Sequence, residues 1–294
     1  MTRTTALGLL VLAAAACGGS QTSTQAPVAA APAPSASAPA PVATAPEAVA
    51  APPAASNGQP KIVTQVDVPP ATAAIVAASD RSDEDKKLDA GRHPGEMLAF
   101  FGIAPGMRVG EIAAAGGYTT ELLARAVGAN GVVYAENPKF ILERYAQKPF
   151  SARLAKPVNA HVVRSDREPS DPFPPEAHDL DVVVDVLFYH DTVWLGVDRD
   201  AMNAAIFRAL KHGGVYGIID HAAKDGSGTN DVKTTHRIEE RVVREEVEKA
   251  GFRLDSKATF LANPSDTRDW NDSPMAAGAK RGTSDRFVLK FVKP

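Results

Sequence analysis

Strand-like apolar runs alternate with amphipathic helical segments along most of the chain, and this alternation constrains the fold more than any other feature. The sequence predicts short helices at 71–78, 83–88 and 94–101, and longer ones at 119–127, 140–147, 201–210 and 237–250. It predicts strands at 108–112, 132–135, 161–164, 181–187, 215–219, 252–260 and 286–292, the last two as an antiparallel edge. This pattern is typical of an α/β domain with a doubly wound, mostly parallel seven-stranded sheet and helices on both faces.

The first 17 residues have the pattern of an export signal. Arg3 precedes a run of small and apolar residues from Ala6 to Ala16, too short to span a bilayer. The run ends in Leu-Ala-Ala-Ala-Ala-Cys at Cys17, the only cysteine, and resembles a bacterial lipoprotein signal. The resemblance implies a membrane-anchored lipoprotein of the cell envelope, on the periplasmic side or in the outer membrane. The alternative is an ordinary secretory signal with an incidental cysteine.

Residues 18–65 are predicted to form a disordered tether. The segment 18–60 consists mainly of Ala, Pro, Ser, Thr and Val, with Glu47 as its only charged residue. Such a segment has too few large apolar side chains to offset its ordering entropy, and its Ala-Pro repeats favour an extended spacer. We therefore expect a signal over 1–17, a tether over 18–65 and one domain over 66–294. The net charge is −3 and the basic residues are scattered along the sequence, which argues against a nucleic-acid partner.

The turn after the first predicted strand is built from small residues. In a doubly wound sheet, ligands bind beyond the carboxyl ends of the strands, and small residues let the backbone approach them closely. The turn reads Glu-Ile-Ala-Ala-Ala-Gly-Gly-Tyr-Thr-Thr over 111–120, after Pro-Gly-Met-Arg-Val over 105–109. It lacks the Lys and Ser/Thr of a phosphate loop and departs from G-x-G-x-x-G.

This turn resembles the first motif of class I S-adenosylmethionine (SAM) methyltransferases, in which an acidic residue ends the first strand and a glycine loop follows. The sequence also resembles a bacterial family known as predicted methyltransferases, which has Tyr-His-Asp after the fourth strand and Asp-His after the fifth. Here these motifs are 189–191 and 220–221, and the resemblance covers roughly 80–294. It implies a Rossmann-like methyltransferase sheet with SAM as cofactor.

The resemblance also implies a set of cofactor contacts. The glycine positions of the family loop are occupied by Ala113, Ala115 and Gly117, so two of the three carry a methyl group. An acidic residue after the second strand, Glu136, would accept hydrogen bonds from the ribose, and Asp166 after the third would bind the adenine amino group. The alternatives are a tight turn without a ligand and ordinary loop carboxylates. The predicted cofactor residues are Glu111, Ala113, Ala115, Gly116, Gly117, Glu136 and Asp166.

Histidines beside carboxylates follow the fourth and fifth predicted strands, where a methyl acceptor would lie. Imidazole is a suitable general base near neutral pH, so we predict His190, Asp191 and His221 as the catalytic residues. We assign no metal ligand, although two histidines with carboxylates could instead bind a metal. His236 would then add a third ligand, or Arg237 a cation for an acidic substrate. The alternative for each of these residues is an ordinary hydrogen-bonded polar side chain in a loop.

These features predict a SAM-dependent methyltransferase that acts on an unknown small-molecule acceptor and is tethered in the cell envelope. One alternative is a methyltransferase-like fold reused to bind a ligand or a metal without methyl transfer, and another is a tethered scaffold. The segment 267–282 is rich in Asp, Asn, Gly and Lys and is predicted to form a long lid-like loop.

Overall fold

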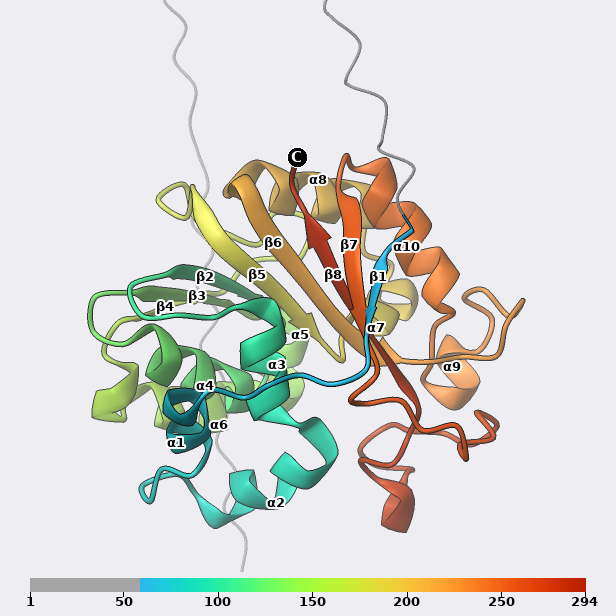
Figure 1. The fold of residues 1–294 in the computed structure, drawn as a ribbon, viewed down its shortest axis with the longest axis horizontal. Coiled ribbons are helices and arrows are strands. Elements are labelled where there is room, and N and C mark those ends of the chain that lie inside the picture. The colour runs from blue at the N-terminus through green and yellow to red at the C-terminus, as the bar shows by residue number, and fades with distance from the viewer. Residues whose placement is uncertain (1–58) are drawn as a thin grey trace, which may run out of the picture. The chain divides into compact units, whose positions relative to one another are not determined.

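An eight-stranded sheet forms the centre of the computed structural model, which describes residues 59–294 (Figure 1). The strand order is β1-β7-β8-β6-β5-β2-β3-β4. The strands are β1 (Lys61–Val63), β2 (Arg108–Ile112), β3 (Val132–Glu136), β4 (Val162–Ser165), β5 (Leu180–Val186), β6 (Leu210–His221), β7 (Arg253–Ala258) and β8 (Arg286–Val292).

The predicted doubly wound, mostly parallel sheet is confirmed, and all seven predicted strands form. Only β8 is antiparallel to its neighbours β6 and β7. The prediction of seven strands was too low by one, because β1 pairs in parallel with β7. β1 lies inside the segment expected to be a tether. Its three residues are too few to show periodicity, and backbone pairing with β7 stabilises it.

Ten α-helices connect the strands or flank them in the described residues. The helix at Pro94–Phe101 has the predicted bounds, and Pro94 begins it in the position where a missing N–H costs nothing. The helix that contains His190 was not predicted. The helices are α1 (Pro70–Val76), α2 (Asp83–Arg92), α3 (Pro94–Phe101), α4 (Tyr118–Val127), α5 (Lys139–Ile141), α6 (Gln147–Leu154), α7 (Tyr189–Leu195), α8 (Arg199–Ala209), α9 (Val232–Thr235) and α10 (Glu240–Lys249).

Helices cover both faces of the sheet, as two adjacent residues of β6 show. Gly217 faces α3, since a Cβ atom there would lie 2.6 Å from the ring of Phe101. Successive strand residues point to opposite faces, so Tyr216 points away from α3. Its ring contacts Phe252, which in turn packs on Phe207 of α8. The apolar core therefore lies in two layers, with α3 on one side of the sheet and α8 on the other.

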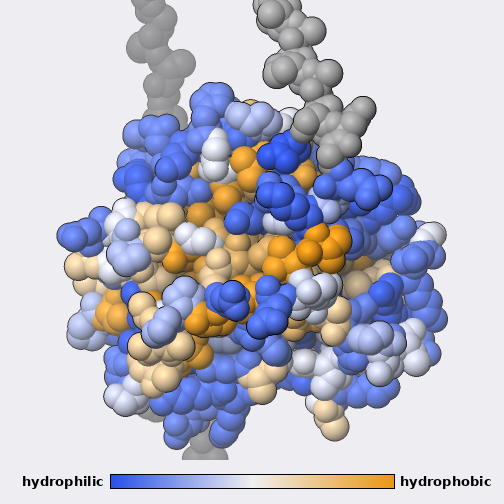
Figure 2. All heavy atoms as spheres, viewed as in Figure 1, coloured by the Kyte–Doolittle hydropathy of each residue, from blue (hydrophilic) through white to orange (hydrophobic). Residues whose placement is uncertain are grey.

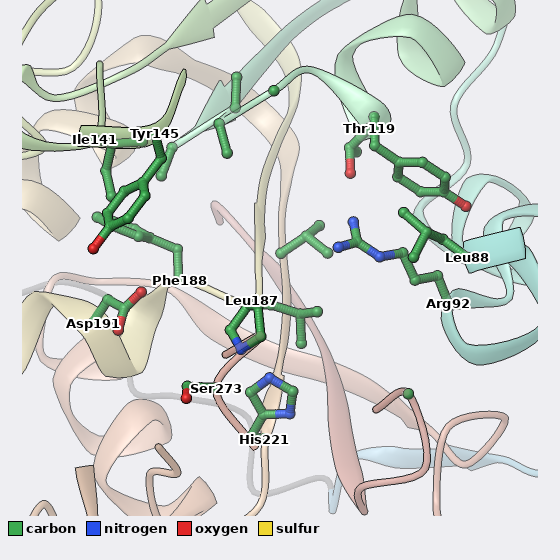
Figure 3. Close-up of a pocket in the computed structure, with 18 of the residues that line it drawn as sticks. Leu88, Arg92, Thr119, Ile141, Tyr145, Leu187, Phe188, Asp191, His221 and Ser273 are labelled. Carbon is green, nitrogen blue, oxygen red and sulfur yellow. The ribbon is translucent and has the colours of Figure 1, made fainter. Parts of the chain in front are cut away.

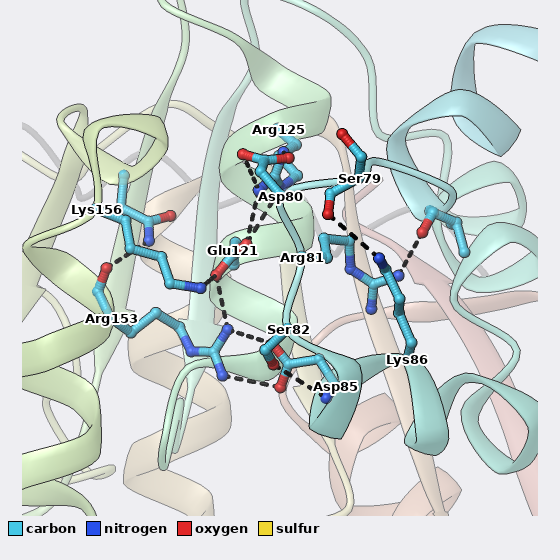
Figure 4. Close-up of polar contacts among 12 residues, drawn as sticks. Ser79, Asp80, Arg81, Ser82, Asp85, Lys86, Glu121, Arg125, Arg153 and Lys156 are labelled. Carbon is cyan, nitrogen blue, oxygen red and sulfur yellow. Dashed lines mark hydrogen bonds and ion pairs between the residues drawn. The ribbon is translucent and has the colours of Figure 1, made fainter.

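A network of ion pairs attaches α2 to α4 and α6 (Figure 4). Glu121 of α4 is buried and accepts hydrogen bonds from Arg125, Arg153 and Lys156 at 2.7–2.8 Å. Arg153 of α6 also donates to Asp85 of α2 at 2.7 Å. One buried carboxylate and one shared guanidinium thus hold α2 over the carboxyl end of β2.

Figure 2 shows hydrophilic residues over most of the visible face and apolar residues gathered in a band across its middle. Between residues 59 and 294, no helix has the length and apolar character needed to cross a bilayer. The predicted signal, the lipid attachment at Cys17 and most of the predicted tether lie outside the described residues.

Candidate active site

A cavity of about 790 Å³ lies beyond the carboxyl ends of β2, β5 and β6 (Figure 3). Its wall combines the loop after β2, the residues after β5, the end of β6, and part of α2. The predicted lid loop also contributes, through Asp272, Ser273, Pro274, Met275, Arg281 and Gly282. The cavity is at the position expected for a ligand in a doubly wound sheet.

The loop after β2 has a strained backbone that its neighbours hold in place. Ala113 and Ala115 have φ values of 50° and 49°, in the left-handed region that disfavours side chains. The Ala113 amide donates to Oε2 of Glu136 at 2.8 Å, and the Ala115 amide donates to Oδ1 of Asn137 at 2.7 Å. Two side chains at the end of β3 therefore fix the loop of β2. Ala113, Ala115 and Gly116 line the cavity.

Gly117 begins α4 and does not line the cavity. Its φ is 81°, and a Cβ atom there would lie 2.7 Å from Cδ of Arg153. Glycine is therefore required at this position for backbone conformation and for space.

Glu111 lies at the end of β2 on the cavity wall and is almost fully buried. Thr120 donates a hydrogen bond to its Oε2 at 2.5 Å. Burial raises the pKa of Glu111 to about 7, although the hydrogen bond from Thr120 and the charges of Arg153 and Arg92 oppose the rise. Glu111 is therefore ready to ionise when a cation binds beside it.

Arg92, at the end of α2, was not predicted and points into the cavity (Figure 3). Its guanidinium lies 4.6 Å from the ring centre of Tyr118. Among the described residues it forms no ion pair, and burial lowers its pKa. No sequence pattern marks Arg92, because it lies beyond the predicted end of the short charged helix at 83–88.

Two predicted cofactor contacts do not reach the cavity. Glu136 is fully buried behind the loop, with Oε1 lacking a hydrogen-bond partner, and burial raises its pKa. Asp166 is half exposed and pairs with Arg164 at 2.6 Å. Neither residue lines the cavity wall, so their assignments to ribose and adenine stay predictions.

His190 is fully buried at the start of α7, between two carboxylates. Its Nδ1 lies 2.6 Å from Oδ1 of Asp220, and its Nε2 lies 3.2 Å from Oδ1 of Asp191. Burial lowers the pKa of His190, but the two carboxylates outweigh it and raise the pKa to about 10. With no metal bound, His190 is therefore a cation at neutral pH. Asp191 lines the cavity and His190 does not, so the geometry disfavours the predicted role of His190 as a proton acceptor.

His221 lines the cavity at the end of β6 (Figure 3). Its Nδ1 lies 2.5 Å from Oδ2 of Asp272 and 3.0 Å from Oγ of Ser284. Burial lowers the pKa of His221 to about 4, even though Asp272 opposes this shift. His221 is therefore a neutral imidazole at physiological pH, and the lid loop holds its ring.

His236 also lines the cavity, directly after α9. Its ring centre lies 4.1 Å from that of His190, and burial lowers its pKa. The neighbouring Arg237, suggested as a substrate cation, is fully buried instead and pairs with Asp266 at 2.8 Å. That pair attaches the residue just before the lid loop to the segment that carries His236.

Exposed apolar side chains gather at the cavity. Of the large apolar side chains exposed between residues 59 and 294, Tyr145, Trp194 and Met275 line the cavity, and only Ile62 does not. Trp194 packs edge-on against Phe140, with ring centres 5.3 Å apart. Exposed aromatic groups at a cavity mouth indicate contact with an apolar part of a ligand.

The fold, a mostly parallel sheet with helices on both faces, is similar to that of solved SAM-dependent methyltransferases. No protein-family model and no curated protein matches the sequence. Among solved structures, a SAM-dependent methyltransferase from Aquifex aeolicus is 20% identical, with a TM-score of 0.50, over 73% of this chain and 100% of that one. A Galdieria sulphuraria protein assigned as a sarcosine dimethylglycine methyltransferase is 14% identical, with a TM-score of 0.51, over 72% of this chain and 89% of that one. At these identities the likeness establishes the fold alone.

Proposed function

We propose that this chain is a SAM-dependent methyltransferase that acts on a small-molecule acceptor. The observation that carries the proposal is the placement of Glu111 and Arg92 on one cavity, beside the loop after β2. The charge of Arg92 lowers the pKa of Glu111, yet the two form no ion pair with each other in the described structure. An acidic side chain and a guanidinium that have no ion-pair partner among the described residues match the ammonium and carboxylate of the methionine part of SAM.

The acceptor would lie on the side of the cavity formed by α7, β6 and α9. Methyl transfer breaks the bond between the SAM sulfur and the methyl carbon and joins that carbon to the acceptor, which loses a proton. His221, a neutral imidazole, and the Asp191 carboxylate both line this side of the wall, and one of them would receive this proton. The exposed rings of Tyr145 and Trp194 favour an acceptor with an apolar portion.

A second candidate is the same fold used to bind a ligand without methyl transfer. It is favoured by Glu136, which bonds to the Ala113 amide instead of facing the cavity. A SAM ribose would have to find other partners or displace this contact.

Calorimetry of the full-length protein with SAM and S-adenosylhomocysteine separates the two candidates. We expect both ligands to bind, and Arg92→Ala to weaken binding by roughly 10- to 100-fold, the scale of a hydrogen bond to a charged group. Arg241→Ala, at an exposed pair on α10, is the matched control and should bind as the wild type does. No binding by wild type at millimolar ligand would favour the fold without methyl transfer.

We further propose that the mature chain is held on a membrane of the cell envelope through a lipid on Cys17, on the basis of residues 1–17 alone. Labelled fatty acid should enter the wild type and not Cys17→Ala, which should be released or remain unprocessed. Equal labelling of both proteins would exclude this attachment.

A further inference from the structure

Three side chains that bind metals elsewhere meet on the acceptor side of the cavity. One ligand atom from each of His190, Asp191 and His236 lies within 4.8 Å of the other two. Oδ1 of Asp191 is 3.2 Å from Nε2 of His190 and 3.7 Å from Nδ1 of His236. Atoms about 2.1 Å from a tetrahedral ion lie roughly 3.4 Å apart. Two of the three separations therefore already match a shared ion.

His190 is oriented in the way that metal-binding histidines usually are. Its Nδ1 lies 2.6 Å from Oδ1 of Asp220, which is fully buried and also accepts from the backbone amides of His190 and His221. A carboxylate held this firmly fixes the ring and places the proton on Nδ1. A bound cation would replace the proton on Nε2, whose lone pair would then point toward Asp191 and the cavity side.

The Nε2 atom of His190 is buried and has no hydrogen-bond partner among the described residues. Its 3.2 Å approach to Asp191 is a charge contact without hydrogen-bond geometry. A buried polar atom without a partner is costly, and such atoms in native structures require an explanation. A bound cation between Nε2 and the Asp191 carboxylate would supply one.

The other two side chains are also held in position and reach the cavity. Nε1 of Trp194 donates to Oδ1 of Asp191 at 2.6 Å. His236 follows α9 with a left-handed backbone, and the buried pair of Arg237 with Asp266 fixes the adjoining chain. Because Asp191 and His236 both line the cavity, an ion between them would keep one side open to a ligand.

We propose that Nε2 of His190, the carboxylate of Asp191 and Nδ1 of His236 bind a divalent transition metal, with a cavity-facing position left for water or a substrate oxygen. Two imidazoles and one carboxylate suit Zn²⁺ or Fe²⁺, whereas Mg²⁺ prefers oxygen ligands. When bound, such an ion polarises the oxygen placed on it. The inference goes beyond the proposed function, since it rests on the ligand geometry and not on SAM.

The test is equilibrium dialysis of the full-length protein against Zn²⁺, with bound metal measured by elemental analysis. We expect one Zn²⁺ per chain in the absence of SAM. His236→Ala and Asp191→Asn, whose side chains border the cavity, should weaken binding by at least 100-fold. His178→Ala, an exposed histidine paired with Asp179, is the control and should bind as the wild type does. Thermal melts establish that each variant is folded.

Asp220→Asn tests the orientation of His190 without removing a ligand. Loss of such a partner costs about 10- to 100-fold in metal affinity, so we expect a weakening of that size and a changed visible spectrum of the Co²⁺-loaded protein. The proposal is overturned if wild type binds no Zn²⁺ at micromolar concentration, if the His236 and Asp191 variants bind normally, or if equimolar Mg²⁺ displaces the Zn²⁺. If the protein binds Zn²⁺ but not SAM, the metal site is supported and the methyltransferase proposal is not. If it binds SAM but not Zn²⁺, the metal site is overturned.

Discussion

Oε2 of Glu136 accepts a hydrogen bond from the amide of Ala113 at 2.8 Å, so the acidic residue that ends β3 holds the loop that follows β2. Asn137 does the same for Ala115, and its side-chain amide also donates back to the Ala115 carbonyl at 3.2 Å. Both alanines are in left-handed conformations. The loop therefore carries backbone strain that the neighbouring strand offsets.

Relief of this strain is testable with Ala113→Gly and Ala115→Gly. A left-handed alanine costs about 1–2 kcal/mol, and glycine loses about 0.5–1 kcal/mol more on folding. Each variant should therefore be as stable as wild type or more stable by up to about 1 kcal/mol in urea unfolding, with SAM affinity unchanged or tighter. Ala126→Gly, inside α4, should instead destabilise by about 1 kcal/mol. A loss at 113 or 115 equal to that at 126 would show that the strain is absent.

SAM binding should depend on pH through Glu111. Burial raises its pKa to about 7 in the free protein, so most molecules carry a neutral Glu111 at pH 5.5. The SAM ammonium favours the carboxylate, and binding therefore expels a proton below pH 7. Affinity should rise roughly tenfold between pH 5.5 and 7, by the arithmetic of a group with that pKa.

Calorimetry in buffers of different ionisation enthalpy would measure this proton release. Glu111→Gln cannot ionise, so it should bind SAM more weakly and lose most of the pH dependence. An unchanged pH profile in Glu111→Gln would assign the dependence to another group.

The ion-pair network around Glu121 should be important for stability. Glu121→Gln leaves Arg125, Arg153 and Lys156 partly uncompensated beside a buried site. Removing one partner of a buried pair costs on the order of 3 kcal/mol. Glu245→Gln removes an exposed partner of Arg241 and should cost under 1 kcal/mol. Chemical denaturation of both variants would compare the two costs, and similar values would mean that Glu121 is already well solvated.

The extent of the domain can be tested by comparing chains that begin at Gln59 and at Val66 with the full chain. We expect the Gln59 chain to melt with the full chain, because β1 is retained. The Val66 chain loses the pairing of β1 with β7 and the packing of Val63 on the core. A loss of about 1–2 kcal/mol would lower its melting temperature by several degrees. Equal melting of all three would mean that β1 contributes no stability.

The fold followed from the sequence because buried parallel strands are long apolar runs and the helices between them are amphipathic. β1 escaped detection because Lys-Ile-Val shows no periodicity and its stability comes from β7, nearly two hundred residues away. α7 escaped because its first turn carries Tyr-His-Asp, which reads as a polar loop.

The candidate site followed only in part. The positions after β2, β5 and β6 were predictable, since topology alone brings strand ends together. The direction in which each side chain points could not be predicted. Glu136 accepts a hydrogen bond from the Ala113 amide, and Asp166 pairs with Arg164. Arg92 reaches the cavity because ion pairs hold α2 over it, and those pairs join residues far apart in the sequence.

The place where the chain enters the sheet determines how the protein can be handled. β1 runs parallel to β7, so Lys61 lies at the amino ends of the parallel strands, while the cavity opens at their carboxyl ends. An affinity tag, fluorophore or solid support joined ahead of Gln59 would therefore connect at the amino ends of the parallel strands, opposite the ligand entrance. Immobilised this way, the protein should keep its entrance accessible to ligands in surface-based binding assays.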